Sequence, residues 1–277
     1  MKRILLHLIY IIAAPALLLL TGCDEVDETD RYVYVKPAAV GRNILIEDYT
    51  GQGCVNCPTG TNQLHALQEQ YGADTVIVVG FHSGPQAKSK RSHIPYSLWT
   101  QDGEDYYTHW KVENQPSIYI DRVTLNETTT AWPTLVRDEL QKPASLKLTA
   151  KATAYSAPDS LCTFEVYAQG TDGTTTGHLQ LWITEDGITD FQYMPDGSVN
   201  REYVHNHVYR MAVNGLWGDD FSIKEGEEKT LPYTCKLKGG WKPENMHMVA
   251  FVYNDSGVQQ VTTCTVIPAE EPTAEEE

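Results

Sequence analysis

Apolar residues recur with two different periods in the two halves of this 277-residue chain. In the first half, the runs "NILIEDYT" (43–50) and "DTVIVVGFHSG" (74–84) are short and continuous, as in strands that are buried on both faces. Between them, apolar residues of "TNQLHALQEQYG" (61–72) fall at i, i+3 and i+7, a helical spacing that ends at a glycine. The pattern predicts a strand–helix–strand unit with both strands in the core.

In the second half, apolar and polar residues alternate in short segments that turn signals separate. Alternation of this kind predicts an all-β, immunoglobulin-like sandwich. The change of period near Pro143 sets the expected boundary between an α/β domain at 41–142, closed by an amphipathic helix at 130–141, and the sandwich at 143–267. The expected strands are "ASLKLTAKATAY", "SLCTFEVYA", "GHLQLWITEDG", "KTLPYTCKL", "MHMVAFVYNDSG" and "VQQVTTCTVI".

The chain begins with a basic n-region and an apolar run, Ile4 to Leu20, which is short for a transmembrane segment. Its end, "LLTGC", resembles a bacterial lipobox, so residues 1–22 are expected to be a signal peptide and Cys23 the first mature residue. In lipoproteins of this kind, acyl chains on that cysteine anchor the protein stably to a membrane. The alternative is a signal anchor that stays in place.

Acidic residues outnumber basic ones, 37 against 21, and give a formal net charge of −16. Such a surface repels nucleic acid, which is therefore excluded as a partner. Acidic runs also flank the predicted domains: "DEVDETD" belongs to a tether at 23–40, and "PAEEPTAEEE" (268–277) is expected to be disordered. Hydrophobic residues make up 41% of the chain, enough for one large core or two smaller ones.

Two cysteines, Cys54 and Cys57, lie between the first predicted strand and the helix. The unpaired N–H groups and the dipole of a helix start favour an anion, so a Cys54 thiolate would be stabilised there. Cys57 lies one helical turn further, close enough for a disulfide. A zinc site needs more ligands at matching spacing, and the sequence shows no second CxxC or paired Cys/His motif nearby. A redox centre and a structural disulfide remain open, and neither a metal nor a cofactor is predicted.

A proline-led apolar run, "QPSIYI", follows later, and proline is permitted at the first residue of a strand. CxxC after a buried strand, followed by proline, serine and an apolar strand, resembles the thioredoxin superfamily. The resemblance implies that Gln115–Pro116 is a cis peptide and that Pro116 faces the cysteines. It also implies that Asp48, six residues before Cys54, is the buried acid that handles protons. Glu47 points to the opposite face of a regular strand and cannot share that position.

The cysteine motif departs from the residues that thioredoxins usually have. Gly53 stands in place of their tryptophan, and Val55-Asn56 in place of Gly-Pro. This pair supplies no imidazole to stabilise the thiolate, so a strongly oxidising potential is not expected. A long segment, 84–110, follows the second strand and either controls access to the site or forms plain covering structure.

Other side chains carry weaker signals. His82 ends the second strand near the cysteines and could accept a proton, although a lone histidine is more often an ordinary packed side chain. His205 and His207 would share one strand face, as some metal sites require, but no further ligands are placed with them. The remaining cysteines share strand faces with apolar residues and are expected to be buried, where an oxidising compartment allows two to pair without the sequence showing which. They are Cys162, Cys235 and Cys264.

Four motifs, "IEDYTGQGCVNCP", "WITEDG", "YVHNHVYR" and "NGLWGDD", together span most of the expected mature chain. They resemble the outer-membrane protein 28-related lipoprotein family of Gram-negative anaerobes. The resemblance implies a lipid-anchored outer-membrane protein with a thioredoxin-like domain and a role in adhesion or surface binding. The acidic residues after Cys23 resemble a signal for transfer to the cell surface, and a periplasmic orientation is the alternative.

Two functions of different classes are consistent with these features. In the first, the protein exchanges disulfides with exported thiol proteins: the Cys54 thiolate attacks a substrate disulfide, Pro116 faces the mixed disulfide, and Cys57 resolves it. In the second, the CxxC is a permanent disulfide in a non-enzymatic scaffold, and the β-sandwich binds a protein or glycan. Fold does not decide between them, and an exported protein lacks an obvious electron source.

Overall fold

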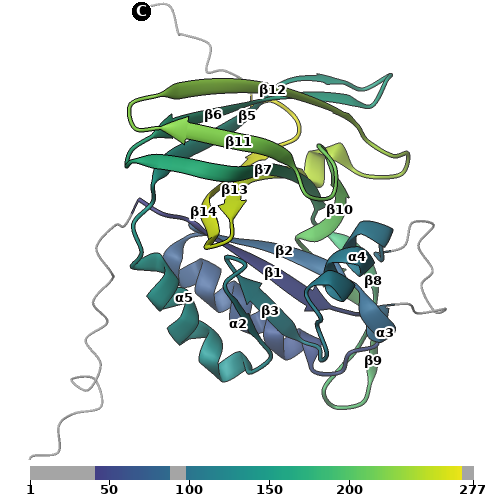
Figure 1. The fold of residues 1–277 in the computed structure, drawn as a ribbon. Coiled ribbons are helices and arrows are strands. Elements are labelled where there is room, and N and C mark those ends of the chain that lie inside the picture. Colours follow the sequence, from purple (N-terminus) through teal and green to yellow (C-terminus); the bar gives the residue numbers. More distant parts are fainter. Residues whose placement is uncertain (1–40, 88–97, 270–277) are drawn as a thin grey trace, which may run out of the picture. The chain divides into compact units, whose positions relative to one another are not determined.

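The strand–helix–strand unit expected in the first half is present in the computed structural model (Figure 1). β1 (Ile44–Thr50) and β2 (Val76–His82) pair in parallel, and α2 (Cys57–Tyr71) connects them. Every residue of both strands is buried, as their continuous apolar runs indicated. β3 (Ser117–Ile120) pairs antiparallel with β1, and β4 (Thr124–Asn126) pairs with β3. The structure describes residues 41–87 and 98–269.

Helices cover one face of these strands. α2 and α5 (Trp132–Leu140) pack apolar side chains against Ile44 and Ile46 of β1. α5 lies within the helix predicted at 130–141 and follows the short helix η2 (Thr129–Ala131). Its apolar side chains face the sheet, as the amphipathic pattern indicated. The short helix α3 (Gly84–Ala87) comes directly after β2.

Two β layers form the second half, and the strands expected from the alternation are all present. One layer is the sheet β12-β6-β5, and the other contains β14, β13 and β7, with β11 beside β7. Side chains from both layers, such as Phe164, Leu181 and Met248, form one apolar core between them. The strands are β5 (Leu146–Ser156), β6 (Leu161–Gly170), β7 (Thr174–Glu185), β11 (Asp219–Lys224), β12 (Glu228–Lys236), β13 (Met246–Asn254) and β14 (Gly257–Thr265), and η3 (Pro243–Asn245) precedes β13.

One sheet runs through both halves of the chain (Figure 1). β10 (Val208–Ala212), from the second half, lies between β7 and β2, where Val208 pairs in parallel with Gly80. The full order is β14-β13-β7-β10-β2-β1-β3-β4. The expected domain boundary at residues 142 and 143 falls between α5 and β5, but hydrogen bonds continue across the two parts.

An aromatic layer joins the two parts on the face of β1 and β2 that the helices α2 and α5 leave uncovered. The Phe81 ring stacks on Tyr209 at a centroid distance of 4.7 Å and meets Trp182 edge-on at 5.2 Å. Trp182 in turn meets Phe251 of β13 at 4.6 Å. β13 and the part of β7 at 179–185 are therefore buried on both faces, since their other face lies against the core of the two β layers.

The start and the end of the described fold lie together. The Asn43 N–H donates to Oε1 of Gln260 at 2.8 Å, and the Val258 N–H donates to the carbonyl of Asp121 at 2.7 Å. Arg42 donates both to the Asp121 carboxylate, at 2.9 Å, and to the Val258 carbonyl, at 2.6 Å. The C-terminal hairpin is thus fastened to the strands at the beginning of the chain.

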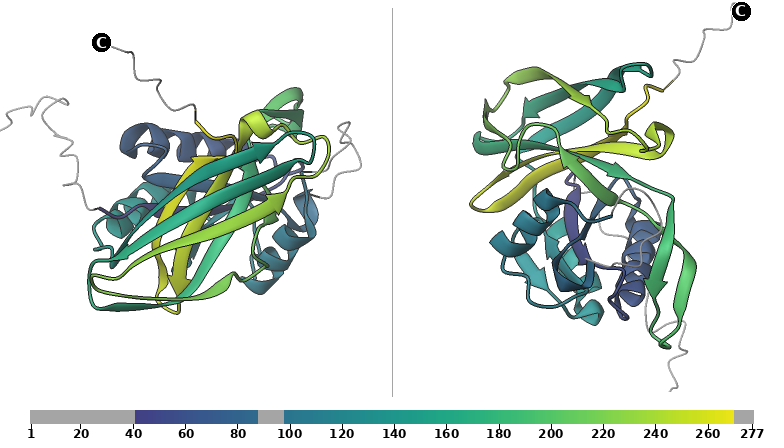
Figure 2. Two further views of the ribbon diagram at one scale, coloured as in Figure 1. Left: turned by 90° about the horizontal axis from the view of Figure 1, so that it is seen from above. Right: turned by 90° about the vertical axis from the view of Figure 1, so that its right-hand side faces the viewer.

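A second hairpin leaves the β layers and reaches the first half (Figure 2). It consists of β8 (Ile188–Tyr193) and β9 (Val199–His205), which pair with each other and with no other strand in the described part of the chain. The Tyr193 N–H donates to the carbonyl of Gln52 at 2.9 Å, so the hairpin contacts the loop that holds the cysteine pair.

The expected membrane anchor lies outside the described residues. This applies to the signal peptide at 1–22, to Cys23 and the tether at 23–40, and to residues 270–277 of the acidic tail. Within 41–87 and 98–269, no helix has both the length and the apolar character needed to span a bilayer.

Candidate active site

The cysteine pair lies where the sequence placed it, at the start of α2. Cys54 and Cys57 form a disulfide with a Cα–Cα distance of 5.4 Å, and Pro58 occupies the first turn of the helix, where its missing N–H costs no intrahelical bond. The two cysteines are 5% and 2% exposed, whereas Val55 between them is 43% exposed. The disulfide is therefore almost completely covered, and the exposed side chain of the CxxC loop next to it is the apolar Val55.

The expected proline lies against this helix. Gln115–Pro116 is a cis peptide, and the Gln115 amide donates to the carbonyls of Thr50 and Ser83 at 2.8 and 3.0 Å. Gly60 allows the first turns of α2 to approach Pro116, because a methyl group at Gly60 would lie 3.1 Å from the proline Cβ.

A hollow of about 560 Å³ begins beside the proline and the cysteine loop. Asn56 and Thr59 of the loop and helix line one side, and Gln115 and Pro116 line the other. The cis-proline and the CxxC motif therefore border one open surface.

Asp48 and Glu47 point to opposite faces of β1. Glu47 accepts a 2.6 Å hydrogen bond from the Tyr49 hydroxyl on the aromatic side of the sheet, while Asp48 lines a small cavity together with Cys57. Burial raises the pKa of Asp48 from 3.8 to about 7, and its Oδ1 atom has no hydrogen-bond partner among the described residues. The cavity measures about 30 Å³, which is room for one water molecule.

Two buried histidines complete this cavity. Nε2 of His82 lies 3.3 Å from Nδ1 of His205, and both residues are about 5% exposed. Burial lowers the pKa of His82 well below its usual value, with smaller contributions from His205 and Arg210, and burial lowers the pKa of His205 to about 4. Both imidazoles are therefore neutral at pH 7, so one ring donates the hydrogen bond and the other accepts it.

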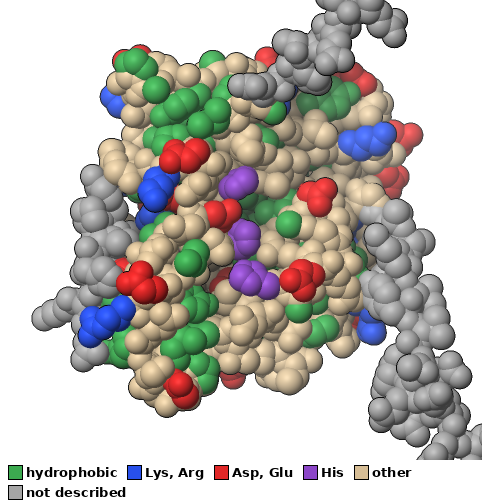
Figure 3. Space-filling view, turned by 180° about the vertical axis from the view of Figure 1, so that it is seen from behind, with side chains coloured by type: hydrophobic (Ala, Val, Ile, Leu, Met, Phe, Trp, Pro, Cys, Tyr) green, Lys and Arg blue, Asp and Glu red, His purple; other side chains and the backbone are tan. Residues whose placement is uncertain are grey.

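The interpretation of His205 and His207 as one strand face was wrong. β9 ends at His205, and His207 has a φ angle of 57°, which turns the chain out of the strand. The His207 ring lies 3.4 Å from Asp186, on a surface where histidine side chains gather (Figure 3). His247 and His65 are neighbours there, at 3.3 Å from Asp186 and 6.4 Å from the His207 ring centroid. In the described part of the chain, no cluster of three or more metal-ligating side chains is present.

The β8–β9 hairpin holds the cysteine loop through side chains that the sequence did not single out. The Gln192 amide donates to the carbonyl of Cys54 at 2.9 Å and to that of Gly51 at 3.2 Å. The Gln52 amide donates to the Asp190 carboxylate at 2.8 Å. These contacts restrict the loop and cover the inner side of the disulfide.

The segment at 84–110 is covering structure where it is described. α4 (Gln101–His109) begins after Thr100, whose hydroxyl accepts a hydrogen bond from the Gly103 N–H at 3.0 Å. It buries Tyr106 completely in the aromatic layer. Residues 88–97 lie outside the described residues, so access control by this segment remains a prediction.

The remaining cysteines lie apart from this site. Cys162 and Cys235 are buried, as expected, and face each other across the paired strands β6 and β12 as free thiols. Cys264 is only partly buried.

These observations define a class of protein: mostly β, with a CxxC disulfide at a helix start beside a cis-proline. The family described as "Outer membrane protein Omp28" matches residues 103–269, and the chain belongs to this family. The expected location, an outer-membrane protein held by a lipid anchor, is confirmed by this membership, since the family is one of outer-membrane lipoproteins.

Solved structures are similar to the chain at the level of the fold. HBP35 of Porphyromonas gingivalis is 16% identical over 85% of this chain and 78% of that protein, with a TM-score of 0.64. A domain of the outer membrane lipoprotein Omp28 from the same organism is 26% identical over 45% of this chain and 90% of that domain, with a TM-score of 0.33. Protein AGR_C_4864 from Agrobacterium tumefaciens is 12% identical over 87% of this chain and 100% of its own, with a TM-score of 0.49. No curated protein matches the chain.

Proposed function

We propose that this lipoprotein exchanges disulfides with exported thiol proteins through a thioredoxin-like site in its first half. One observation carries the proposal: the Cys54–Cys57 disulfide begins a helix that lies against the cis Gln115–Pro116 peptide, with a buried carboxyl group, Asp48, behind Cys57. In this proposal the two β layers at 143–267 form an immunoglobulin-like sandwich that supports the site.

The exchange starts from the disulfide. A substrate thiolate attacks the Cys54 sulfur, which is the more exposed of the pair, and the Cys57 sulfur leaves. The departing thiolate takes a proton from the Asp48 carboxyl group, whose pKa of about 7 leaves it partly protonated at neutral pH. A second substrate thiolate then attacks the substrate sulfur that is bonded to Cys54. The substrate leaves as a disulfide, and the CxxC pair has gained its two electrons.

The surroundings of the disulfide suit this chemistry. The positive end of the α2 dipole lies at the cysteine loop and would stabilise a Cys54 thiolate once the pair is reduced. Val55 is exposed next to Asn56, which lines the hollow at Pro116, so a substrate segment in the hollow finds an apolar contact there.

The scaffold function is the second candidate, and the hydrogen bonds from the β8–β9 hairpin favour it. Gln192 fixes the Cys54 carbonyl, and the pair itself is nearly covered, as a permanent disulfide would be. In that case the protein binds a partner without redox chemistry, at the cell surface or on the periplasmic face of the outer membrane.

A redox titration distinguishes the two functions. The mature chain with Cys23→Ser is equilibrated in thiol buffers, alkylated and analysed by mass, with Cys54→Ser/Cys57→Ser as the control. A working dithiol has a potential between about −270 and −120 mV, whereas a structural disulfide lies below about −300 mV. A value in the lower range would exclude exchange as the function.

A further inference from the structure

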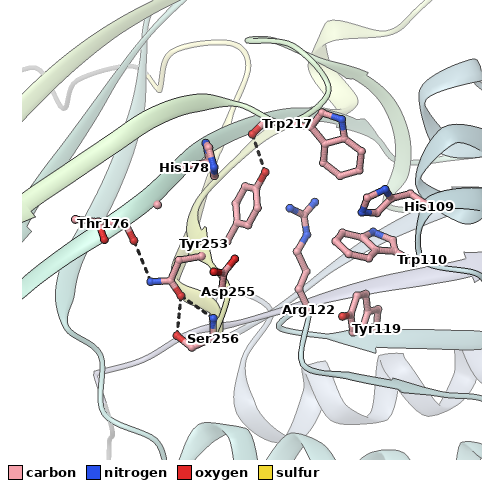
Figure 4. Close-up of a pocket in the computed structure, with 12 residues that line it drawn as sticks. His109, Trp110, Tyr119, Arg122, Thr176, His178, Trp217, Tyr253, Asp255 and Ser256 are labelled. Carbon is pink, nitrogen blue, oxygen red and sulfur yellow. Dashed lines mark hydrogen bonds between the residues drawn. The ribbon is translucent and has the colours of Figure 1, made fainter.

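Figure 4 shows a further cavity, which is lined by Arg122. It lies on the other side of the sheet from the cysteine site, because Glu47, the partner of Arg122, and Asp48 point to opposite faces of β1. Its volume is about 930 Å³, at the upper end of the range for ligand sites, and it opens where the two halves of the chain meet. The end of α4 and the residues after β3 supply one side, and β7, the loop before β11 and the β13–β14 turn supply the other.

Arg122 lies at the centre of this cavity and is only partly satisfied. Its Nε atom is 2.7 Å from the Glu47 carboxylate, and its side chain is 2% exposed. Nη1 and Nη2 have no hydrogen-bond partner among the described residues. Tyr253 and Trp110 flank the guanidinium, with ring centroids 4.2 and 5.3 Å from its carbon atom (Figure 4). Cation–π contacts stabilise the charge but do not take the place of hydrogen-bond acceptors for the N–H groups.

A second buried donor in the same cavity is also unpaired. Nε1 of Trp110 has no partner within the described ranges, although buried indole N–H groups usually find one. Buried donors of this kind are completed by an ordered water, an ion or a ligand, and the cavity beside Arg122 and Trp110 has room for one. The backbone of Arg122 has a φ angle of 57°, which is uncommon for a residue other than glycine.

The rest of the lining combines flat rings with a polar rim. Trp217 is 36% exposed, and its carbonyl accepts a 2.7 Å hydrogen bond from the Tyr253 hydroxyl, which fixes both residues at the wall. Asp255 and Ser256 lie at the rim in the β13–β14 turn, and His178 lies across from them (Figure 4). The cavity therefore offers aromatic faces, unpaired donors and an exposed carboxylate acceptor.

We propose that this cavity binds a neutral pyranose ring of a glycan. A sugar hydroxyl both accepts and donates hydrogen bonds. Neighbouring hydroxyls of one ring can therefore accept hydrogen bonds from the N–H groups of Arg122 and donate hydrogen bonds to the Asp255 carboxylate. The flat C–H face of the ring packs on Trp110 or Trp217. A carboxylated ligand fits less well, because Glu47 already pairs with Arg122, Asp255 is at the rim, and the chain carries a net charge of −16. This site is independent of the proposed exchange of disulfides.

The test is calorimetric titration of the full mature lipoprotein in detergent. The probes are neutral tetrasaccharides of glucose, mannose and xylose, with galacturonic acid tetrasaccharide and the open-chain polyol sorbitol as comparison ligands. At least one neutral tetrasaccharide should bind with a dissociation constant on the order of 1 mM or tighter. Sorbitol should not bind, because it has the hydroxyls but no flat ring.

Variants then locate the binding. Trp217→Ala and Asp255→Ala should each weaken binding at least about tenfold, and Arg122→Lys, which keeps a charge for Glu47 but removes the guanidinium donors, should do the same. Trp241→Phe and Asp196→Ala, which do not line the cavity, should leave affinity unchanged. Thermal unfolding of each variant shows that the fold is intact.

Three results would overturn the proposal: no binding of any neutral tetrasaccharide, binding of the galacturonic acid probe alone, or unchanged affinity in the Trp217 and Asp255 variants.

Discussion

Replacing Asp48 by Asn removes a buried ionisable group while keeping its shape. Burial raises the pKa of Asp48 from 3.8 to about 7, so between these values the unfolded chain is ionised while the folded chain keeps its proton. The folded state loses stability through this window as pH rises, by 1.36 kcal/mol for each pH unit, which totals about 4 kcal/mol. Below the window both states are protonated, and the residue has no electrostatic effect on stability.

The measurable quantity is the difference in free energy of unfolding between Asp48→Asn and the wild type, from urea denaturation at pH 4 and pH 8. This difference should shift in favour of the variant by about 4 kcal/mol on going from pH 4 to pH 8. A pH-independent packing cost of the asparagine cancels in the comparison. Titration of His82 and His205 cancels too, because both proteins contain them.

The exposed residue Asp196 provides the control, since Asp196→Asn should give a difference that changes little with pH. A difference for Asp48→Asn that stays constant between pH 4 and pH 8 would refute the reasoning, because it would mean that the carboxyl group ionises in the fold as easily as in water.

Three further predictions concern neighbouring groups. Arg122→Ala should destabilise the fold by about 3–5 kcal/mol in urea denaturation, because Glu47 is left buried and unpaired. In an Asp48→Asn background the free energy of unfolding should rise with pH between about 4 and 6.5. In this range the buried His205 is neutral in the folded chain, whereas the same histidine is protonated in the unfolded chain. The variant His205→Gln should therefore reduce the slope of stability against pH. Gln192→Ala should speed alkylation of reduced Cys54 several-fold, because the loop loses two hydrogen bonds.

A specific result would contradict each of these three predictions. The double variant Glu47→Gln/Arg122→Met should recover part of the lost stability, and no recovery would mean that the ion pair is not the cause. A pH slope that His205→Gln leaves unchanged would assign the titration to another group. Equal alkylation rates in Gln192→Ala and in the control Gln169→Ala, a half-buried glutamine on β6 that does not contact the cysteine loop, would show that the hairpin does not restrict the loop.

Local patterns in the sequence were enough for the strand–helix–strand unit, for six strands of the second half and for part of the site, whereas β8 to β11 were not predicted. The helix start, the buried strands and the cysteine spacing are encoded within a few residues, and the opposite directions of Glu47 and Asp48 follow from the strand period alone. The turn at His207 was missed because its positive φ interrupts a run whose composition is typical of a strand.

Contacts between distant segments could not be predicted in this way. His205 lies 123 positions after His82, and Gln192 lies 138 positions after Cys54. No periodicity connects such pairs, because the register of β10 beside β2 and the direction of the β8–β9 hairpin are set by packing of the whole fold. The partly satisfied Arg122 was invisible for the same reason, since its rings come from both halves of the chain.

The fastening of the C-terminal hairpin to Asn43 and Asp121 has a consequence for the order of folding. A chain that is exported N-terminus first presents β1, the cysteine loop and β2 early, but Val258 and Gln260, which fasten this part, arrive last. Folding of the first half alone would leave the aromatic side of β1 and β2 in water. The cysteines are therefore available to oxidants on an unfinished chain, and the cooperative transition waits for the final strand.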